Sequence, residues 1–211
     1  MSLAAPISKP APGRGALWIK LCGITTAEAI EAALETGVDA IGFVFAPSVR
    51  RLDLPQAAAL AATARGRCAL VAVTLHPSQS WVDEILRCFE PDMLQADLSD
   101  LEGLRLPPRL QTLPVIRLTA GPLPQGRLLF EGATSGGGAL ADWSAAERIA
   151  RERELILAGG LNAANVAAAV HSVRPFGVDV SSGVESMPGR KSLELIREFV
   201  QSARAAAGEH T

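Results

Sequence analysis

The sequence predicts a single (β/α)8 barrel, and three observations lead to this prediction. Short apolar runs alternate with helix-like segments along most of the chain, as they do in parallel βαβ units. These runs recur at intervals of about 20–25 residues, and a series of about eight favours a closed barrel. An open doubly wound sheet would show the same alternation and remains the alternative. The length of 211 residues suits one domain. We expect residues 1–15 to form a flexible lead-in and residues 16–207 to form the barrel.

Strands are expected wherever a short apolar run is bounded by turn residues. In chain order the expected strands are Leu17–Leu21, Asp39–Phe45, Cys68–Thr74, Asp92–Gln95, Pro114–Leu118, Arg127–Phe130, Glu154–Ala158 and Phe176–Val180. Because parallel strands all end on the same face of a barrel, the residues that follow them should meet there.

Helices are expected between most of these strands. The segments are residues 26–35, Pro55–Ala64, Ser80–Phe89, Asp100–Leu106, Ser144–Arg151, Ala163–Val170 and Ser192–Ala206. Thr25 or Thr26 can cap the first helix, and Glu28 has the capping-box spacing from Thr25. Gly37 is well placed to end that helix.

The connection after the fifth strand differs from the others. Thr119–Gly126 contains two Pro and two Gly, so the fifth helix is predicted to be missing or vestigial. Farther along, Asn162 is a plausible N-cap for the helix that begins at Ala163.

Composition and charge exclude several classes of protein. Hydrophobic residues make up 48% of the chain and charged residues 20%, so disorder is not expected. The net charge is −2 and no run of Lys or Arg occurs, which argues against nucleic-acid binding. No apolar stretch is long enough to cross a membrane, and no apolar segment follows Lys9 and Arg14 as in a secretory signal. The odd cysteine count without metal-like spacing (Cys22, Cys68 and Cys88) fits a reducing cytoplasm.

Glycines gather after the last three expected strands. They lie in Gly136–Gly138, Gly159–Gly160 and Ser181–Gly183. Glycine allows backbone N–H groups to approach an anion, and the loops after strands seven and eight hold phosphate in many barrels. A single pair would be explained well enough by a tight turn. Three clusters in the last third of a barrel favour phosphate binding.

Cys22 lies at the end of the first expected strand. An unpaired Cys is usually a small packing residue, but Gly23 marks a strand end, and at a barrel mouth a thiol can act as base or nucleophile. Cys68 and Cys88 lack this context and are interpreted as packing residues. The histidines, which are His76, His171 and His210, do not follow strands in a way that would form a Cys/His pair.

Several segments resemble phosphoribosylanthranilate isomerase. These are KLCGIT at 20–25, GVDAIGFVF at 37–45, LAGGLN at 157–162, GVDVSSGVES at 177–186 and the pair Asp142-Trp143. The resemblance implies a (β/α)8 TIM barrel and an Amadori rearrangement in tryptophan biosynthesis. The substrate would be N-(5-phosphoribosyl)anthranilate and the product 1-(2-carboxyphenylamino)-1-deoxyribulose 5-phosphate. It also implies a cytoplasmic monomer or homodimer that needs no metal or organic cofactor.

The resemblance assigns roles to individual residues. Cys22 would be the base that removes the C2′ proton, once an acid has opened the furanose ring. Arg50 would pair with the anthranilate carboxylate, although Val49 replaces the usual Pro, Arg51 is an adjacent competitor and a plain surface Arg is the alternative. The phosphate-binding residues would be Gly137, Gly138, Gly159, Gly160, Ser181, Ser182 and Gly183.

The chain departs from the family pattern at two places. The acid is usually an Asp after strand six, and Glu131 stands there with one more methylene. Asp179 matches a family carboxylate and is the second candidate for the acid, unless it orients the substrate amine or bonds loop amides. After strand four, the segment Gln95–Leu98 keeps the Gln of a QLHG-like sequence but lacks its His and Gly.

Other barrels remain alternatives. A histidine-biosynthesis isomerase with a two-phosphate substrate should have two equivalent glycine-rich halves, and none are evident. Indole-glycerol-phosphate synthase needs a Lys inside the barrel, and of the three lysines (Lys9, Lys20 and Lys191) only Lys20 is a weak candidate. A barrel that has lost activity and serves in binding is the non-enzyme alternative, kept open by the departures at Glu131 and Asp97.

Overall fold

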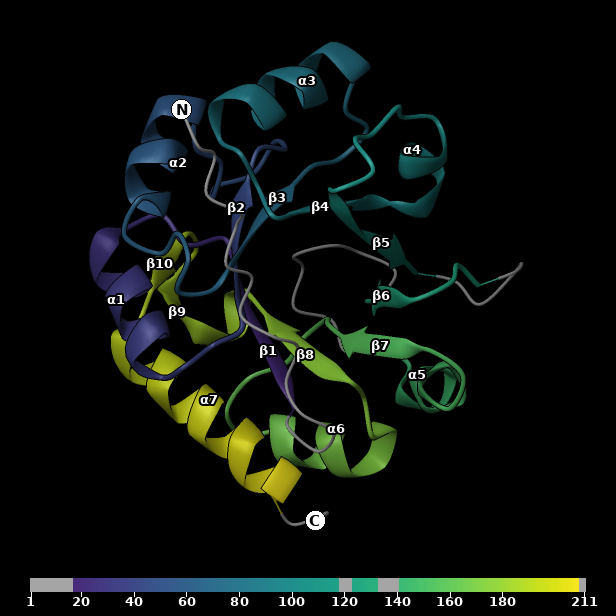
Figure 1. Cartoon of the computed structure of the whole chain (residues 1–211). Helices are drawn as coiled ribbons and strands as arrows, with labels where there is room; N and C mark the ends of the chain where they lie inside the picture. Colours follow the sequence, from purple (N-terminus) through teal and green to yellow (C-terminus); the bar gives the residue numbers. More distant parts are fainter. Residues whose placement is uncertain (1–16, 118–122, 133–140, 209–211) are drawn as a thin grey trace.

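The computed structural model describes residues 17–117, 123–132 and 141–208, and they form a closed parallel barrel surrounded by helices (Figure 1). The strands are β1 (Trp18–Cys22), β2 (Ala40–Val44), β3 (Ala69–Val73), β4 (Met93–Asp97), β5 (Gln111–Ile116), β6 (Arg127–Phe130), β7 (Glu154–Leu157) and β8 (Gly177–Val180). Strand β8 pairs with both β7 and β1, so the sheet has no edge. This closure confirms the predicted TIM barrel and rules out the open doubly wound sheet.

Helices cover the outside of the barrel. They are α1 (Ala27–Glu35), α2 (Leu54–Ala61), α3 (Gln79–Cys88), α4 (Leu98–Glu102), α5 (Trp143–Ala150), α6 (Val166–Val173) and α7 (Leu193–Gly208). Between β5 and β6, residues 123–126 form no helix, as predicted, and residues 118–122 of this connection lie outside the described part. The breaking effect of Pro124 and Gly126 explains why residues 123–126 form no helix.

The start of α1 differs in detail from the prediction. Thr26, not Thr25, is the N-cap, and its side chain accepts a hydrogen bond from the N–H of Ala29. The hydroxyl of Thr25 instead donates to the carbonyl of Gly189, which ties the β1–α1 loop to the end of the chain's last hairpin. The helix ends as expected, with Gly37 at a φ of 71°.

Helix α6 begins later than predicted. Asn162 was expected to cap a helix starting at Ala163, but the helix starts at Val166. The Asn162 side chain accepts hydrogen bonds from the N–H groups of Ala164 and Asn165, which form a turn before the helix. Local side-chain bonding of Asn therefore competes with helix initiation here.

Alternation along each strand separates two apolar cores. Residues that face outward pack under the helices, as Ile19 and Leu21 of β1 do. A second cluster fills the inside of the barrel with Trp18, Ala40, Val71, Met93, Leu113, Val115, Leu129, Ile156 and Ala158. On β1, the interior positions after Trp18 are Lys20 and Cys22, so the barrel interior becomes polar toward its carboxyl-terminal end. Among the described residues no helix could span a membrane.

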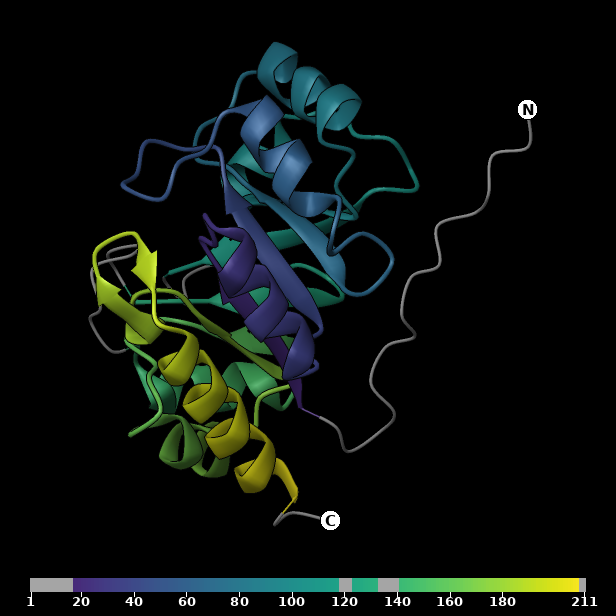
Figure 2. The same cartoon turned by 90° about the vertical axis from the view of Figure 1, so that its left-hand side faces the viewer.

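A hairpin that the sequence did not suggest follows β8. After the 3-10 turn at Ser182–Val184, strands β9 (Glu185–Met187) and β10 (Arg190–Lys191) pair antiparallel. Gly189 takes a φ of 82° in its turn, and the Pro188-Gly189 pair was the available signal. Figure 2 shows this hairpin at the same end of the barrel as the β2–α2 loop, so both contribute to the mouth.

Candidate active site

Cys22 is the last residue of β1 and lies inside the barrel at its carboxyl-terminal end, with 8% of its surface exposed. The next residue, Gly23, has a φ of 72° and donates its N–H to the carbonyl of Gly42. Strand β1 thus turns away directly after the thiol. A side chain at Gly23 would clash with Arg50, whose Cδ lies 2.5 Å from the position of such a Cβ.

Lys20 is completely buried two residues before Cys22, on the same side of the strand. Its Nζ donates to Oδ1 of Asp179 over 2.9 Å, and the two residues are partners in the β1–β8 ladder. Gly42, the β2 partner of Cys22, makes room for this arrangement. A Cβ at Gly42 would lie 3.0 Å from Sγ of Cys22 and 3.2 Å from Nζ of Lys20, so both groups converge on the bare glycine.

The charges around Cys22 act in opposite directions. Burial is the largest influence and raises the pKa of the Cys22 thiol, while Lys20 favours the thiolate, Asp179 opposes it and Lys191 weakly favours it. For Lys20, burial alone would lower the pKa, but Asp179 and Cys22 together raise it above the ordinary value. Lys20 is therefore a stable ammonium inside the barrel.

Arg50 reaches the mouth of the barrel and is bound by Glu185. Its Nε and Nη2 donate to the two carboxylate oxygens of Glu185 at 2.6 and 2.8 Å. Lys191 donates to the same carboxylate at 2.8 Å and to the carbonyl of Ser181 at 2.9 Å. Although burial alone would raise it, the hydrogen bonds from Arg50 and Lys191 lower the pKa of Glu185 to about 2. Of the two neighbouring arginines, Arg50 lies at Gly23 while Arg51 is exposed.

The loops after β7 and β8 present free backbone donors. Gly159 and Gly160 have φ values of 89° and 66°, which favour glycine. A Cβ at Gly183 would lie 1.8 Å from the carbonyl oxygen of Leu161, so the two loops contact each other backbone to backbone. Within the described ranges, the N–H groups of Gly160, Ser182 and Gly183 donate to no protein acceptor. Such clustered donors suit an oxyanion.

Two of the predicted phosphate-binding residues, Gly137 and Gly138, lie outside the described residues. Ser181 is described, and its hydroxyl donates to the carbonyl of Cys22 at 3.1 Å. This bond links the β8 loop to the end of β1, so the side chain of Ser181 supports the site's backbone in this structure.

Glu131 directly follows β6, on the far side of the barrel mouth from β1. Its Oε1 lies 2.7 Å from Nη2 of Arg117, whose Nη1 donates to Oδ1 of Asp97 over 2.6 Å. Arg117 therefore bridges the ends of β4, β5 and β6. Burial would lower the pKa of Arg117, but the two carboxylates raise it above the ordinary value.

The site falls into two groups of charged residues. The first, on β1, β8 and the hairpin, joins Cys22 and Asp179 with Arg50 nearby. The second, at the ends of β4 to β6, contains Glu131, and β7 and β8 separate its strand from β1. A substrate in the mouth would lie between the two groups.

Lys20, Arg117 and Glu185 were not among the site residues predicted for an isomerase, although Lys20 was the weak candidate for a synthase lysine. Lys20 shares the strand face of Cys22. Arg117 follows Leu113 and Val115 at the same two-residue spacing, which places it on the inner side of the barrel. It was predicted to be part of a strand ending at Leu118, but β5 ends at Ile116 and Arg117 follows the strand. Glu185 stands next to the SSG segment, and nothing local marked it as the partner of Arg50.

Comparisons with known proteins agree on one family. Residues 119–202 match the family model described as N-(5'phosphoribosyl)anthranilate (PRA) isomerase. N-(5'-phosphoribosyl)anthranilate isomerase from Rhodopseudomonas palustris (strain TIE-1) is 42% identical over 209 residues, covering 89% of this chain and 98% of the relative. The protein of the same name from Bradyrhizobium sp. (strain BTAi1 / ATCC BAA-1182) is 38% identical, covering 90% and 96%.

Solved structures give the same result. TrpF from Jonesia denitrificans superposes with a TM-score of 0.76 at 34% identity, covering 91% of this chain and 98% of that one. A phosphoribosyl anthranilate isomerase in complex with reduced 1-(o-carboxyphenylamino)-1-deoxyribulose 5-phosphate superposes with a TM-score of 0.73 at 26% identity, covering 90% and 99%. With this agreement over nearly the whole barrel, the chain belongs to the N-(5'-phosphoribosyl)anthranilate isomerase family.

Proposed function

We propose that Cys22 and Glu131 perform the two proton transfers of the family's isomerisation in this chain. The substrate is N-(5-phosphoribosyl)anthranilate, and the product is 1-(2-carboxyphenylamino)-1-deoxyribulose 5-phosphate of tryptophan biosynthesis. The observation that carries the proposal is that a thiol and a buried ammonium lie together beside Gly42 on one side of the mouth, with the Glu131 carboxylate on the other. No metal or organic cofactor is required for this acid–base chemistry.

Cys22 acts as the base. Once the ring has opened to a Schiff base, the C2′ proton is acidified by the adjacent C=N group, and a thiolate can remove it. The resulting enolamine then becomes the ketone of the product.

Glu131 acts as the acid that protonates the furanose ring oxygen. Asp179 is the weaker candidate because its carboxylate is held by the ammonium of Lys20 inside the barrel. Glu131 is also paired, but its partner Arg117 has a second carboxylate, Asp97, to which it can remain bound when Glu131 takes up a proton. Asp179 then orients the substrate amine and keeps Lys20 in place.

Arg50 binds the anthranilate carboxylate. A guanidinium has two edges that can form paired hydrogen bonds. Glu185 occupies the edge formed by Nε and Nη2, and the edge that includes Nη1 is left for a second carboxylate. Glu185 therefore fixes the orientation of Arg50 and does not compete for that edge.

The phosphate of the substrate lies on the loops after β7 and β8. The free N–H groups of Gly160, Ser182 and Gly183 are its donors. Gly159 and Ser181 shape these loops, and Gly137 and Gly138 belong to the third phosphate-binding loop of the proposal. The enzyme acts in the cytoplasm as a monomer or homodimer, and light scattering of the purified protein distinguishes these two states.

An anthranilate-fluorescence assay tests the proposed function. The intact protein should consume the phosphoribosyl substrate, Cys22→Ala should abolish turnover, and Glu131→Gln should lower kcat strongly. Cys88→Ser is the matched control, because Cys88 lies on α3 outside the barrel and its removal should leave kcat unchanged.

Two results would contradict parts of this assignment. If the intact, folded protein shows no turnover, the chain is a binding barrel and not an isomerase. If Glu131→Gln keeps full activity, Glu131 is not the acid, and Asp179 becomes the candidate for that role.

A further inference from the structure

A charged residue with no exposed surface occupies the middle of the barrel. Lys20 is 0% exposed, and the interior layer beneath it is apolar, with Trp18 on its own strand. A buried ion pair adds little net stability compared with apolar residues of similar volume. The pair of Lys20 and Asp179 is therefore poorly explained by stability alone, and its location beside Cys22 suggests a function.

We propose that Lys20 is a positioning residue that stabilises the thiolate of Cys22 and so makes the base available. The inference rests on the proposed role of Cys22. The geometry is the shared position of Sγ and Nζ beside Gly42, where no side chain stands between the buried ammonium and the thiol. The positive charge of Lys20 favours the thiolate and is the largest of the charge effects on Cys22.

The other charged groups near Cys22 do not replace Lys20. Asp179 on β8 is negative and works against the thiolate. Lys191 on β10 is positive, but it donates to Glu185 on β9 and to Ser181, and its effect on Cys22 is the weaker one. Arg50, from the β2–α2 connection, has its charge balanced by Glu185.

Removing Lys20 should therefore shift the titration of Cys22 upward. The thiolate is the form that Lys20 favours, so its loss raises the pKa of the thiol. In Lys20→Met, the pH midpoint for alkylation of Cys22 by iodoacetamide should rise by about one unit or more. At a pH below both midpoints, the alkylation rate should fall about tenfold, because only the thiolate reacts. Mass spectrometry of the Cys22 peptide separates this signal from Cys68 and Cys88.

Control variants separate the charge of Lys20 from its other contributions. Lys20→Arg, which keeps the charge, should retain a midpoint near that of the unaltered protein. Lys191→Met removes a second buried cation near Cys22 and should give a smaller shift than Lys20→Met. An equal or larger shift for Lys191→Met would overturn the assignment to Lys20, as would an unchanged midpoint in Lys20→Met.

Unfolding of a variant can be recognised because it would shift the pKa of Cys22 in the opposite direction. Unfolding would expose Cys22 and lower its pKa toward that of a free thiol, opposite to the predicted shift. Lys20→Met with Asp179→Asn leaves no buried unpaired charge, and circular dichroism checks its fold. Comparison with Asp179→Asn isolates Lys20, because both variants lack the Asp179 carboxylate and differ only at residue 20. The midpoint of the double variant should lie above that of Asp179→Asn, and an equal or lower midpoint in the folded double variant would refute the inference.

The titration is independent of turnover. It uses no substrate, so it can succeed even if the protein proves not to be an isomerase. Conversely, a protein that turns over substrate while Lys20→Met titrates normally would keep the proposed function and lose only this inference. In an active protein, the ascending limb of the pH profile of kcat/KM should move with the alkylation midpoint.

Discussion

Glu185 connects two cations that belong to different parts of the site. It binds the guanidinium of Arg50 in two hydrogen bonds and the ammonium of Lys191 in a third, and the N–H of Gly189 donates to it as well. These contacts hold the hairpin against the β2–α2 loop. Glu185 thereby fixes the position of Arg50, the residue proposed to bind the anthranilate carboxylate.

The depressed pKa of Glu185 predicts how stability depends on acid. Its pKa falls from the ordinary value of 4.5 to about 2. The folded state therefore binds this proton less readily than the unfolded state, so the contribution is fully present above about pH 4.5 and is lost as the pH falls toward about 2.

Urea unfolding between these pH values measures this contribution. Glu185→Gln should lower stability at neutral pH and flatten the acid-induced loss. Glu194→Gln, at the start of α7, is the control and should keep the original slope. The same slope in Glu185→Gln and in the unaltered protein would show that Glu185 is not responsible.

At the scale of elements, the carboxyl ends of β4, β5 and β6 are joined by one side chain. Arg117 holds Asp97 and Glu131 together across three neighbouring strands. Glu131 stands where the resemblance led us to expect Asp, and Asp97 lies in the segment that lacks the expected His and Gly. Both departures therefore meet at Arg117, which places the longer carboxylate.

Loss of this bridge should impair catalysis. In Arg117→Met, kcat should fall by about 10- to 100-fold, because Glu131 would lose its fixed position and even a small displacement of the acid slows proton transfer. Binding of substrate should change less, so KM reports whether the mouth has kept its shape. Steady-state fluorescence assays give both constants.

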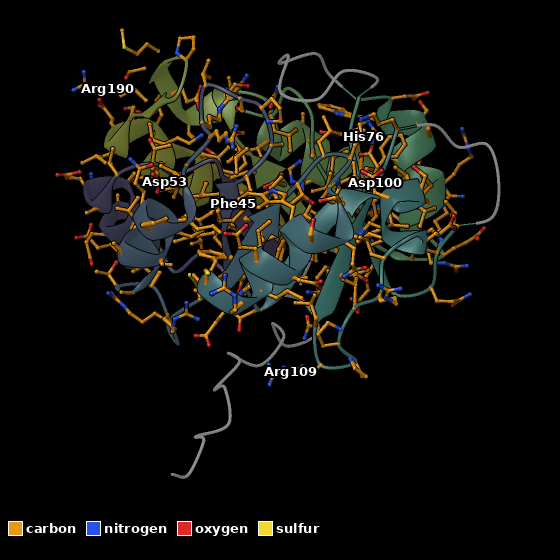
Figure 3. The ribbon with its side chains drawn as sticks, turned by 90° about the horizontal axis from the view of Figure 1, so that it is seen from above. Phe45, Asp53, His76, Asp100, Arg109 and Arg190 are labelled. Atoms are coloured by element: carbon orange, nitrogen blue, oxygen red, sulfur yellow. The ribbon has the colours of Figure 1, made fainter. Side chains whose placement is uncertain are left out.

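The control for this prediction lies at the other end of the barrel. Arg109 is exposed there, far from His76 and Asp100 at the mouth (Figure 3). Arg109→Met should leave kcat unchanged. An Arg117→Met enzyme with full kcat would mean that Glu131 is placed by other contacts or is not the acid.

For the whole molecule, barrel closure joins the first strand to the last helix. Arg204 of α7 donates to the carbonyl of Leu17, to that of Gly37 and to the carboxylate of Asp39. Asp39 also accepts from the N–H of Ile19. These bonds lie at the amino-terminal ends of the barrel strands, so we expect them to stabilise the fold without affecting the site at the carboxyl-terminal ends.

Arg204→Met should therefore lower the stability of the protein without lowering its catalytic rate. We expect a loss of about 1–3 kcal/mol in the free energy of unfolding, because a buried carboxylate loses a charged partner. The matched control is Arg197→Met, whose pair with Glu35 is largely exposed and should contribute less than about 1 kcal/mol. Urea denaturation measures the stability of both variants, and steady-state kinetics measures their activity. A strong loss of kcat/KM in Arg204→Met would show that the amino-terminal end of the barrel also affects catalysis.

Much of this molecule follows from periodicities in its sequence. The alternation of apolar runs and helices predicted the barrel, because each βαβ unit buries its strand only against its neighbours. The glycines after β7 and β8 and the thiol at the end of β1 were recognisable, since parallel strands bring their ends to one face. Element boundaries were less accurate where side chains bond locally, as at Thr26 and Asn162.

The pairing of charges was decided only by the tertiary structure. Lys20 and Asp179 are far apart in the sequence and meet because β8 closes against β1. In the same way, Arg50 meets Glu185 through the final hairpin, and Arg117 meets Glu131 across two strands. An ion pair depends on distance in space, which a local pattern does not encode. The sequence by itself determined the barrel and its thiol, and the closure of the sheet determined which charges surround that thiol.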